Sequence, residues 1–252
     1  MDKKNKKTIG ILGGMGPEAT LSLYNLIIDK TPAKKDQDHI HVIINSNPAI
    51  PDRTRYIVYG EESPLEMLKE GVILLEKAGA DMILISCNTA HYFVPELSKY
   101  ISIPILHMLD LTCKYIAQSV QSRDEYSGAI KVPIGILATT GTIKTELYQT
   151  YLGKYNLESV LPTEQEQESL VMEAIYGRKG IKAGYHEGPA KLLQQAANLL
   201  VQRGAQFVIA GCTEVPLALT SKMVTVPLIN SMEILAQAAV NSALNKPYFY
   251  KL

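Results

Sequence analysis

The strongest constraint on the fold of this chain is an internal repeat with a spacing of 125 residues. The sequence GIL at residues 10–12 returns at 135–137, and each copy leads into a turn that contains glycine. A longer segment, GADMILISCNT at 79–89, matches GAQFVIAGCTE at 204–214. The chain has 252 residues, enough for two α/β domains of ordinary size. Two motifs with one common spacing therefore predict two copies of a single α/β unit.

Strands and helices alternate within each copy. Short apolar runs rich in β-branched residues are typical of strands buried on both faces of a parallel sheet, and they occur at 40–44, 82–85, 132–137 and 207–210. Helical stretches at 64–78 and 189–203 each end at a glycine, Gly79 or Gly204. We therefore expect an α/β protein with two pseudo-symmetric, doubly wound parallel-sheet domains and the active site in the cleft between them.

The first domain is expected to span residues 1–110 plus 230–252, and the second residues 111–229, with approximate boundaries. Pro104 and Pro227 precede short apolar runs that predict a final strand late in each half. A C-terminal helix is predicted at about 231–243, and its sequence is compatible with packing on either half.

Two of the three cysteines, Cys87 and Cys212, occupy the same place in the repeat, directly after a predicted strand. Ligands of open parallel sheets bind outside the carboxyl ends of the strands, so both thiols are expected in the site. Each is followed by a polar pair suited to opening a helix, whose N-terminus would stabilise a thiolate. Cysteine is also a common core residue, and this is the interpretation that we favour for Cys113 in the helical stretch 109–120.

Two thiols on opposite sides of a substrate suit the inversion of a stereocentre. One group removes a proton from one face while the other supplies a proton to the opposite face, so one must be deprotonated and the other protonated. The repeated context of Cys87 and Cys212 favours this catalytic interpretation over a structural one.

Charge and composition exclude several classes of function. The chain carries 25 basic and 25 acidic side chains, so its net charge does not attract nucleic acid or an anionic membrane. The basic cluster formed by Lys3, Lys4, Lys6 and Lys7 is interpreted as a solvated tail. No signal peptide or membrane span is predicted, and the widely separated cysteines form no zinc or disulfide pattern, so we expect a cytoplasmic protein with reduced thiols and no metal.

Four motifs carry a resemblance to a known family: GGMGPEAT at 13–20, PDRT at 51–54, CNTAH at 87–91 and GCTE at 211–214. On these motifs, spread over most of the chain in the expected order, the sequence resembles the aspartate/glutamate racemase family. Glutamate racemases of cell-wall synthesis typically have an Asp-Ser pair in place of Gly13 and Gly14 and histidine in place of Glu214. Both differences favour the aspartate racemase branch.

The resemblance implies a racemase that works without pyridoxal phosphate or another cofactor, with Cys87 and Cys212 as the acid/base pair. It also implies a homodimer and a small dicarboxylic amino acid as substrate, with aspartate first and glutamate or a broader range of amino acids as alternatives. An arginine can clamp a carboxylate with two hydrogen bonds, and a lysine offers a point charge. The substrate-binding residues that we expect are Arg53, Asn88, Thr89, Ala90, Lys182, Met15, Thr213, Glu214 and Thr140.

Basicity alone does not remove an α-proton, so catalysis needs donors that stabilise charge developing on the α-carboxylate. Backbone N–H groups after the two cysteines and at 139–142 are the expected donors. Glu214 and His91 are candidates for tuning or orienting the thiols, and both are equally compatible with capping or core roles.

Three other functions fit parts of the sequence. Gly14, Gly16 and Ala19 match a loose dinucleotide-binding pattern, but 45–47 lacks the acidic residue that this motif expects. Related reactions of the same superfamily are hydantoin racemisation, maleate isomerisation and arylmalonate decarboxylation. A non-catalytic amino-acid-binding module is the third. Aspartate and glutamate differ by one methylene, a discrimination of roughly 1–3 kcal/mol that the sequence does not reveal.

Overall fold

The computed structural model describes residues 6–122 and 131–247. Lys3 and Lys4 of the basic N-terminal cluster lie outside the described residues. Lys7 is exposed, as predicted, but the segment is not a free tail: the Lys7 N–H donates to the carbonyl of Ala243 at 3.0 Å, and the Lys6 ammonium donates to the carbonyl of Asp38. Among the residues that the structure describes, no helix combines the length and the apolar character needed to cross a membrane.

Contacts between Cα atoms divide the chain into two compact units. In the described chain, unit 1 holds residues 6–56, 60–111 and 232–247, and unit 2 holds residues 57–59, 112–122 and 131–231. The chain leaves unit 1 within helix α5 (Met108–Gln121) and returns at the start of helix α12 (Ser231–Ala243). The C-terminal helix, for which the sequence allowed either half, therefore belongs to unit 1 from Met232 onward.

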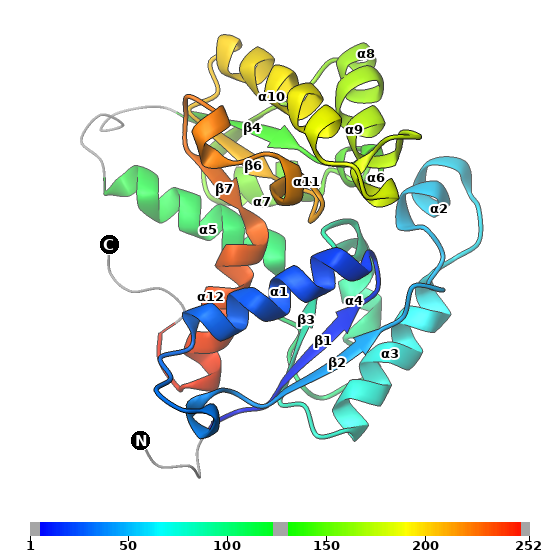
Figure 1. The fold of residues 1–252 in the computed structure, drawn as a ribbon, viewed down its shortest axis with the longest axis vertical. Coiled ribbons are helices and arrows are strands. Elements are labelled where there is room, and N and C mark those ends of the chain that lie inside the picture. Colours follow the sequence, from blue (N-terminus) through cyan, green and yellow to red (C-terminus); the bar gives the residue numbers. More distant parts are fainter. Residues whose placement is uncertain (1–5, 123–130, 248–252) are drawn as a thin grey trace. The chain divides into compact units, whose positions relative to one another are not determined.

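Unit 1 is built on a parallel sheet of order β2-β1-β3 (Figure 1). Its strands are β1 (Ile9–Gly13), β2 (Val42–Ser46) and β3 (Met82–Ile85), and a parallel bridge between Ile83 and Ile105 extends the pairing beyond β3. Besides α12 from Met232 onward and the first residues of α5, its helices are α1 (Pro17–Lys30), η1 (Asp36–Asp38), α2 (Arg53–Tyr59, whose last three residues are assigned to unit 2), α3 (Leu65–Lys77), η2 (Thr89–Phe93) and α4 (Val94–Leu97). Because parallel crossovers are right-handed, α1 and α3, which lead in opposite directions across the sheet, cover opposite faces.

Unit 2 repeats this plan with one more strand, in the order β5-β4-β6-β7. Its strands are β4 (Val132–Leu137), β5 (Leu157–Val160), β6 (Phe207–Ala210) and β7 (Leu228–Asn230). Its helices are α6 (Thr140–Lys144), α7 (Leu147–Lys154), α8 (Glu164–Glu166), η4 (Gln167–Met172), α9 (Glu173–Tyr176), η5 (Ile181–Ala183), α10 (Glu187–Gln202), α11 (Val215–Ala218) and η6 (Ser221–Met223).

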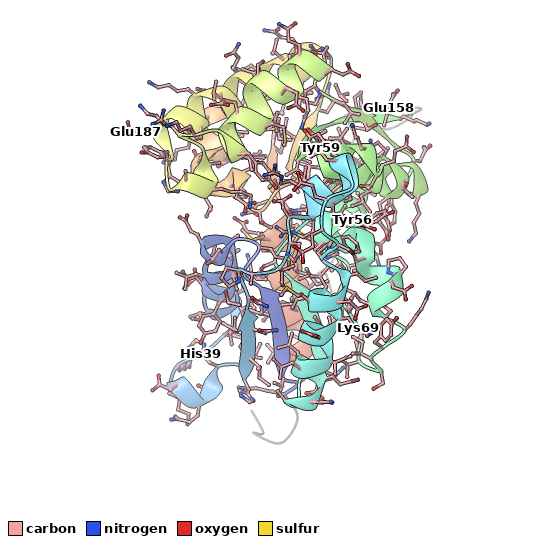
Figure 2. The ribbon with its side chains drawn as sticks, turned by 90° about the vertical axis from the view of Figure 1, so that its right-hand side faces the viewer. His39, Tyr56, Tyr59, Lys69, Glu158 and Glu187 are labelled. Carbon is pink, nitrogen blue, oxygen red and sulfur yellow. The ribbon has the colours of Figure 1, made fainter. Side chains whose placement is uncertain are left out.

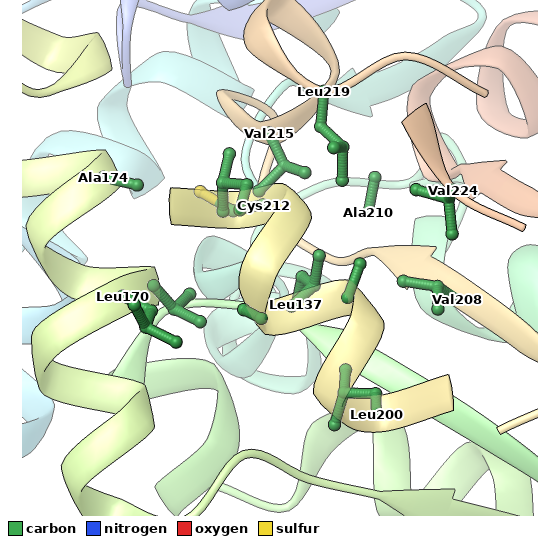
Figure 3. Close-up of a cluster of buried hydrophobic side chains, with 14 of the residues drawn as sticks. Leu137, Leu170, Ala174, Leu200, Val208, Ala210, Cys212, Val215, Leu219 and Val224 are labelled. Atoms are coloured by element: carbon green, nitrogen blue, oxygen red, sulfur yellow. The ribbon is translucent and has the colours of Figure 1, made fainter. Parts of the chain in front are cut away.

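Apolar side chains of the long helices form the cores. In unit 2, Leu200 of α10 packs with Leu137 of β4 and Val208 of β6 in one buried cluster (Figure 3). The outer faces carry charge, as with Lys69 on α3 and Glu187 on α10 (Figure 2). This amphipathic pattern is what drives both helices onto their sheets.

The two parallel sheets confirm the expected fold class, and three strands have the bounds that their apolar runs predicted. The strand predicted at 40–44 is wrong by two residues, since β2 runs to Ser46. Its end is set by parallel pairing with β1, where Gly13 lies opposite Ser46, and not by hydrophobicity. Both predicted glycine stops are present: Gly79 and Gly204 have φ of 94° and 95°, a left-handed backbone that glycine adopts at low cost.

Candidate active site

Cys87 lies in the loop that follows β3 in unit 1. Its side chain is buried, with 6% exposure, and the three residues after it, predicted to bind substrate, are buried as well: Asn88, Thr89 and Ala90. Thr89 begins the 3-10 turn η2, and the helix after it, α4, has only four residues. The segment after Cys87 is thus a tightly packed turn and not the start of a long helix.

His91 fixes the backbone of Cys87. Its Nε2 accepts the N–H of Met108 at 3.1 Å, so Nδ1 carries the proton and donates to the carbonyl of Cys87 at 2.8 Å. Burial, followed by the nearby His107, lowers the pKa of His91 to about 3, so the ring is neutral. His91 is a buried residue that bonds the Cys87 backbone and not its thiol, so a direct effect on the thiol stays a prediction.

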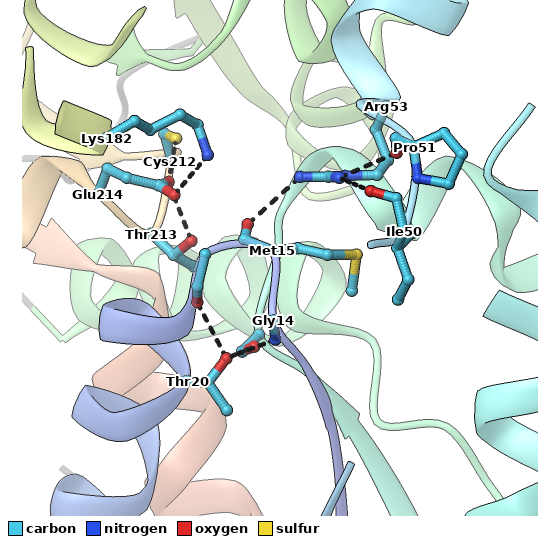
Figure 4. Close-up of polar contacts among 12 residues, drawn as sticks. Gly14, Met15, Thr20, Ile50, Pro51, Arg53, Lys182, Cys212, Thr213 and Glu214 are labelled. Atoms are coloured by element: carbon cyan, nitrogen blue, oxygen red, sulfur yellow. Dashed lines mark hydrogen bonds and ion pairs between the residues drawn. The ribbon is translucent and has the colours of Figure 1, made fainter. Parts of the chain in front are cut away.

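The glycine-rich turn after β1 is tied to the same loop. Thr20 Oγ1 accepts the N–H of Gly14 at 2.9 Å and is hydrogen-bonded to Ser86 Oγ at 2.9 Å, next to Cys87 (Figure 4 shows the Gly14 bond). Gly14 has φ of 90°, and a Cβ at this position would lie 2.3 Å from the backbone of Asn47. Packing against the backbone of Asn47 therefore requires glycine at position 14, whether or not a ligand approaches this turn.

Arg53 joins two segments of unit 1 and is buried, with 6% exposure. Its Nη1 donates to the carbonyls of Ile50 at 3.2 Å and Pro51 at 3.0 Å, and its Nη2 donates to the carbonyl of Met15 at 3.4 Å (Figure 4). The guanidinium thus connects the loop before α2 to the glycine-rich turn. These contacts place Arg53 beside Met15, and clamping of a substrate carboxylate remains a prediction.

Cys212 lies in the equivalent loop of unit 2, after β6, and is also 6% exposed. Its Sγ–H donates to Glu214 Oε2 at 2.8 Å, and Glu214 Oε1 accepts the ammonium of Lys182 at 2.9 Å (Figure 4). The Thr213 hydroxyl donates to the same Oε2 at 3.2 Å. Four predicted site residues of unit 2 are thus joined in one network.

The electrostatics of this network favour a protonated Cys212. Burial and the negative charge of Glu214 raise the pKa of the Cys212 thiol well above its ordinary value, against the opposing effect of Lys182. For Glu214, burial acts to raise the pKa, but Lys182 and the bond from Cys212 lower it overall. The backbone N–H of Glu214 does act to lower the pKa of the thiol, as expected of a helix start, but α11 has only four residues and this effect is outweighed by burial and the Glu214 carboxylate.

Lys182 and Thr140 also have partners within unit 2. The Lys182 ammonium lies 5.2 Å from the ring centroid of Tyr176, and Lys182 is exposed as a residue, as are Arg178 and Lys179. Thr140 donates its hydroxyl to Glu168 at 3.0 Å and its N–H to Met172 Sδ at 3.3 Å. The Thr142 N–H donates to Thr139 Oγ1 at 3.4 Å, so two amides of 139–142 that were expected to bind substrate charge are donated to protein atoms.

Sequence reasoning missed Tyr148, Thr20 and Ser86. Tyr148 is fully buried, and a Cβ on Gly211 would lie 2.8 Å from its Cε2, which explains why glycine precedes Cys212 where Ser86 precedes Cys87. The sequence could have revealed this difference, because the repeat aligns Ser86 in the first copy with Gly211 in the second. No group of three metal-ligating side chains capable of holding an ion occurs in the described part of the chain.

Comparisons with known proteins identify the family of this chain. The family model for Asp/Glu/hydantoin racemases matches residues 12–239. The chain is 30% identical over 240 residues to the broad specificity amino-acid racemase RacX of Bacillus subtilis, covering 94% of this chain and 98% of that protein. Among solved structures, the aspartate racemase of Picrophilus torridus is 28% identical with a TM-score of 0.75, covering 94% of both chains. An aspartate racemase homologue from Pyrococcus horikoshii is 25% identical with a TM-score of 0.71, covering 94% of this chain and 99% of that one. The chain belongs to the Asp/Glu/hydantoin racemase family.

Proposed function

We propose that this protein is an amino-acid racemase that inverts the α-carbon by two-base proton transfer, with Cys87 and Cys212 as the acid/base pair. One observation supports this most directly: the repeat places a buried thiol at the same position after equivalent strands of both units. Inversion needs two groups of suitable chemistry, one for each face of the α-carbon.

In the proposed reaction, one thiolate takes the proton from Cα and becomes a thiol. The electron pair left on Cα is delocalised into the α-carboxylate as an enediolate, which backbone N–H donors of the cysteine loops would stabilise. The other thiol then delivers its proton to the opposite face and becomes a thiolate. The substrate is thereby inverted with no net change in atoms or electrons, and the two cysteines exchange protonation states.

Aspartate is the first substrate that we propose. Arg53 and Lys182 supply the positive charge that two carboxylates require, and the similar protein from Picrophilus torridus is an aspartate racemase. The protein's formal charge is zero, so attraction of an acidic substrate would depend on these local groups.

Broad specificity is the second candidate, and one contact favours it. The Lys182 ammonium is bonded to Glu214 at 2.9 Å, so a substrate side-chain carboxylate would compete with a carboxylate of the protein. A neutral side chain would face no such competition. The relative from Bacillus subtilis is a broad specificity amino-acid racemase.

Solvent hydrogen exchange tests the proposed reaction. Incubation with L-aspartate in deuterated water should place deuterium at Cα and produce the D-enantiomer, detected by mass spectrometry and chiral chromatography. Cys87→Ala and Cys212→Ala should each abolish racemisation in both directions, while Cys113→Ala, a core substitution in α5, should retain it. Absence of exchange with every amino acid tested would refute the proposal, and loss of activity in Cys113→Ala would refute the assignment of the cysteines.

A substrate panel separates the two candidates. We expect kcat/KM to be highest for aspartate if Lys182 receives the substrate's second carboxylate, and to be similar for neutral amino acids if Glu214 keeps Lys182 occupied. Hydantoins and maleate belong in the same panel, because turnover of these compounds alone would assign the chain to a different reaction of the superfamily. Homodimeric assembly remains a prediction.

A further inference from the structure

The two cysteine loops differ in a residue that bears on proton transfer. The first loop reads Cys87-Asn88-Thr89 and the second reads Cys212-Thr213-Glu214, so the repeat aligns a neutral hydroxyl with a carboxylate. The strands that lead into them are both fully buried, and both thiols have 6% exposure. The two thiols are therefore equally buried, and they differ in the residue two positions after them and in the side chains that this residue contacts.

The Glu214 carboxylate is 4% exposed and accepts hydrogen bonds on both oxygens. Oε2 receives the Cys212 Sγ–H at 2.8 Å and the Thr213 hydroxyl at 3.2 Å, and Oε1 receives Lys182 at 2.9 Å. An ionised carboxylate is an acceptor only, so the contact with sulfur is attractive only when the sulfur carries a proton. A thiolate at this distance would form a pair of like charges out of contact with water, which disfavours ionisation of the thiol.

We propose that Glu214 is a positioning residue that keeps Cys212 in its thiol form, so that Cys212 is the proton donor and Cys87 the proton acceptor when the resting protein takes its first substrate molecule. The catalytic meaning of this assignment rests on the proposed racemase function. The effect of Glu214 on the thiol does not, since it follows from the contacts within unit 2.

Lys182 completes the arrangement. A carboxylate this deeply buried would otherwise tend to take up a proton, and the ammonium at 2.9 Å keeps it ionised. Tyr148, which is electrostatically coupled to Cys212, is buried, and burial raises its pKa above its ordinary value. Tyr148 is neutral in this state, so Glu214 supplies the negative charge that holds the proton on sulfur.

With Cys212 protonated in the resting protein, only one of the two enantiomers meets both cysteines in the protonation states that its reaction needs. In the first turnover of a resting molecule, Cα loses its proton to Cys87 and gains the proton of Cys212 on the other face. Cys212 is then left as a thiolate beside Glu214, and it regains a proton from solvent while Cys87 releases one. The enantiomer whose α-proton faces Cys87 therefore reacts directly, and the other enantiomer needs a prior exchange of protons.

Thiol alkylation measures the proposed effect without any substrate. The full-length protein is treated with iodoacetamide over a series of pH values, and modification of each cysteine is followed by mass spectrometry of proteolytic peptides. The wild-type protein is compared with Glu214→Gln, Lys182→Met and the matched control Glu187→Gln, which removes an exposed acid at the start of α10 (Figure 2). Cys113, with 0% exposure, reports unfolding if it becomes reactive.

Glu214→Gln should lower the pH midpoint of Cys212 alkylation by about one to three units, because a like charge beside the thiol is removed. Lys182→Met should raise it, since the cation that opposes Glu214 is lost and a carboxylic acid ionises before the thiol over the alkaline part of the pH series, so the like charge is present when Cys212 titrates. Glu187→Gln should leave it at the wild-type value. An unchanged Cys212 midpoint in folded Glu214→Gln overturns the proposal.

If Cys113 reactivity shows that Glu214→Gln is unfolded, Lys182→Met decides, and a midpoint that does not rise overturns the proposal. Failure of racemisation with normal alkylation shifts would refute the proposed function alone. Normal racemisation in both directions without these shifts would refute only the role of Glu214.

Discussion

His91 makes the stability of unit 1 depend on pH, and its substitution by glutamine tests the contact that fixes Cys87. The folded protein holds the ring neutral, with a pKa of about 3 against an ordinary value of 6.5. The unfolded chain therefore binds a proton more readily than the folded one. This stabilising contribution is fully present above pH 6.5 and is lost as the pH falls from 6.5 toward 3.

The expected size follows from the two pKa values. Between pH 7.5 and pH 5.0, protonation of the unfolded chain at this one site lowers the free energy of unfolding by about 2 kcal/mol. His91→Gln removes the titrating group, so this part of the pH dependence should disappear. The variant should also be less stable at pH 7.5 by about 1–3 kcal/mol, because glutamine does not satisfy the amide of Met108 and the carbonyl of Cys87 in the same geometry.

Urea unfolding followed by circular dichroism at both pH values measures these quantities. The control is His39→Gln, which removes a histidine of unit 1 that lies outside this network (Figure 2). The loss of stability between the two pH values should be about 2 kcal/mol smaller in His91→Gln than in the wild type and in the control. An equal loss in all three proteins would show that His91 is protonated in the folded state and would refute the assigned tautomer.

Two further predictions concern the glycine-rich turn. Gly14→Ala should destabilise the protein by more than about 2 kcal/mol, because its Cβ would lie 2.3 Å from the backbone of Asn47 and its φ is 90°. Gly79→Ala, with φ of 94° but nothing within 4 Å, should cost only about 1–2 kcal/mol, and urea unfolding giving equal losses would contradict the packing argument. Thr20→Val, nearly equal in shape, should cost about 1–3 kcal/mol in the same assay by leaving the Gly14 N–H and the Ser86 hydroxyl without this partner, and a wild-type stability would contradict it.

The strands were readable from the sequence because their signal is local. The runs at 82–85, 132–137 and 207–210 are apolar throughout, and burial on both faces is what such runs predict. The strand β2 was misplaced because it is an edge strand that ends in Asn45 and Ser46, whose positions depend on pairing with β1. Local hydrophobicity carries no information about that register.

The sequence predicted which residues belong to the candidate site, but it did not predict the hydrogen-bond partners of those residues. Cys212, Glu214 and Lys182 were all selected from the sequence, yet Lys182 was assigned to a substrate carboxylate and is bonded to Glu214. The two residues lie 32 positions apart, and only the folding of η5 against the loop after β6 brings them to 2.9 Å. Burial and the negative charge of Glu214 raise the pKa of the Cys212 thiol, against the effect of Lys182, whereas the position of Cys212 before a helix had predicted a lowered pKa.

The chemistry of racemisation gives a reason for the unequal loops. The repeat supplies like strands, as Ile83 and Val208 show, and it supplies like thiols. An amino acid bound at one site nevertheless presents its carboxylate, amine and side chain in a chiral arrangement, so two acid/base groups that approach Cα from opposite faces never have mirror-related surroundings. Identical loops would therefore not give the two thiols matched acidities in the presence of substrate. In the proposed mechanism, the difference between Thr89 and Glu214 would add to this asymmetry, because it sets which thiol carries the proton before substrate binds.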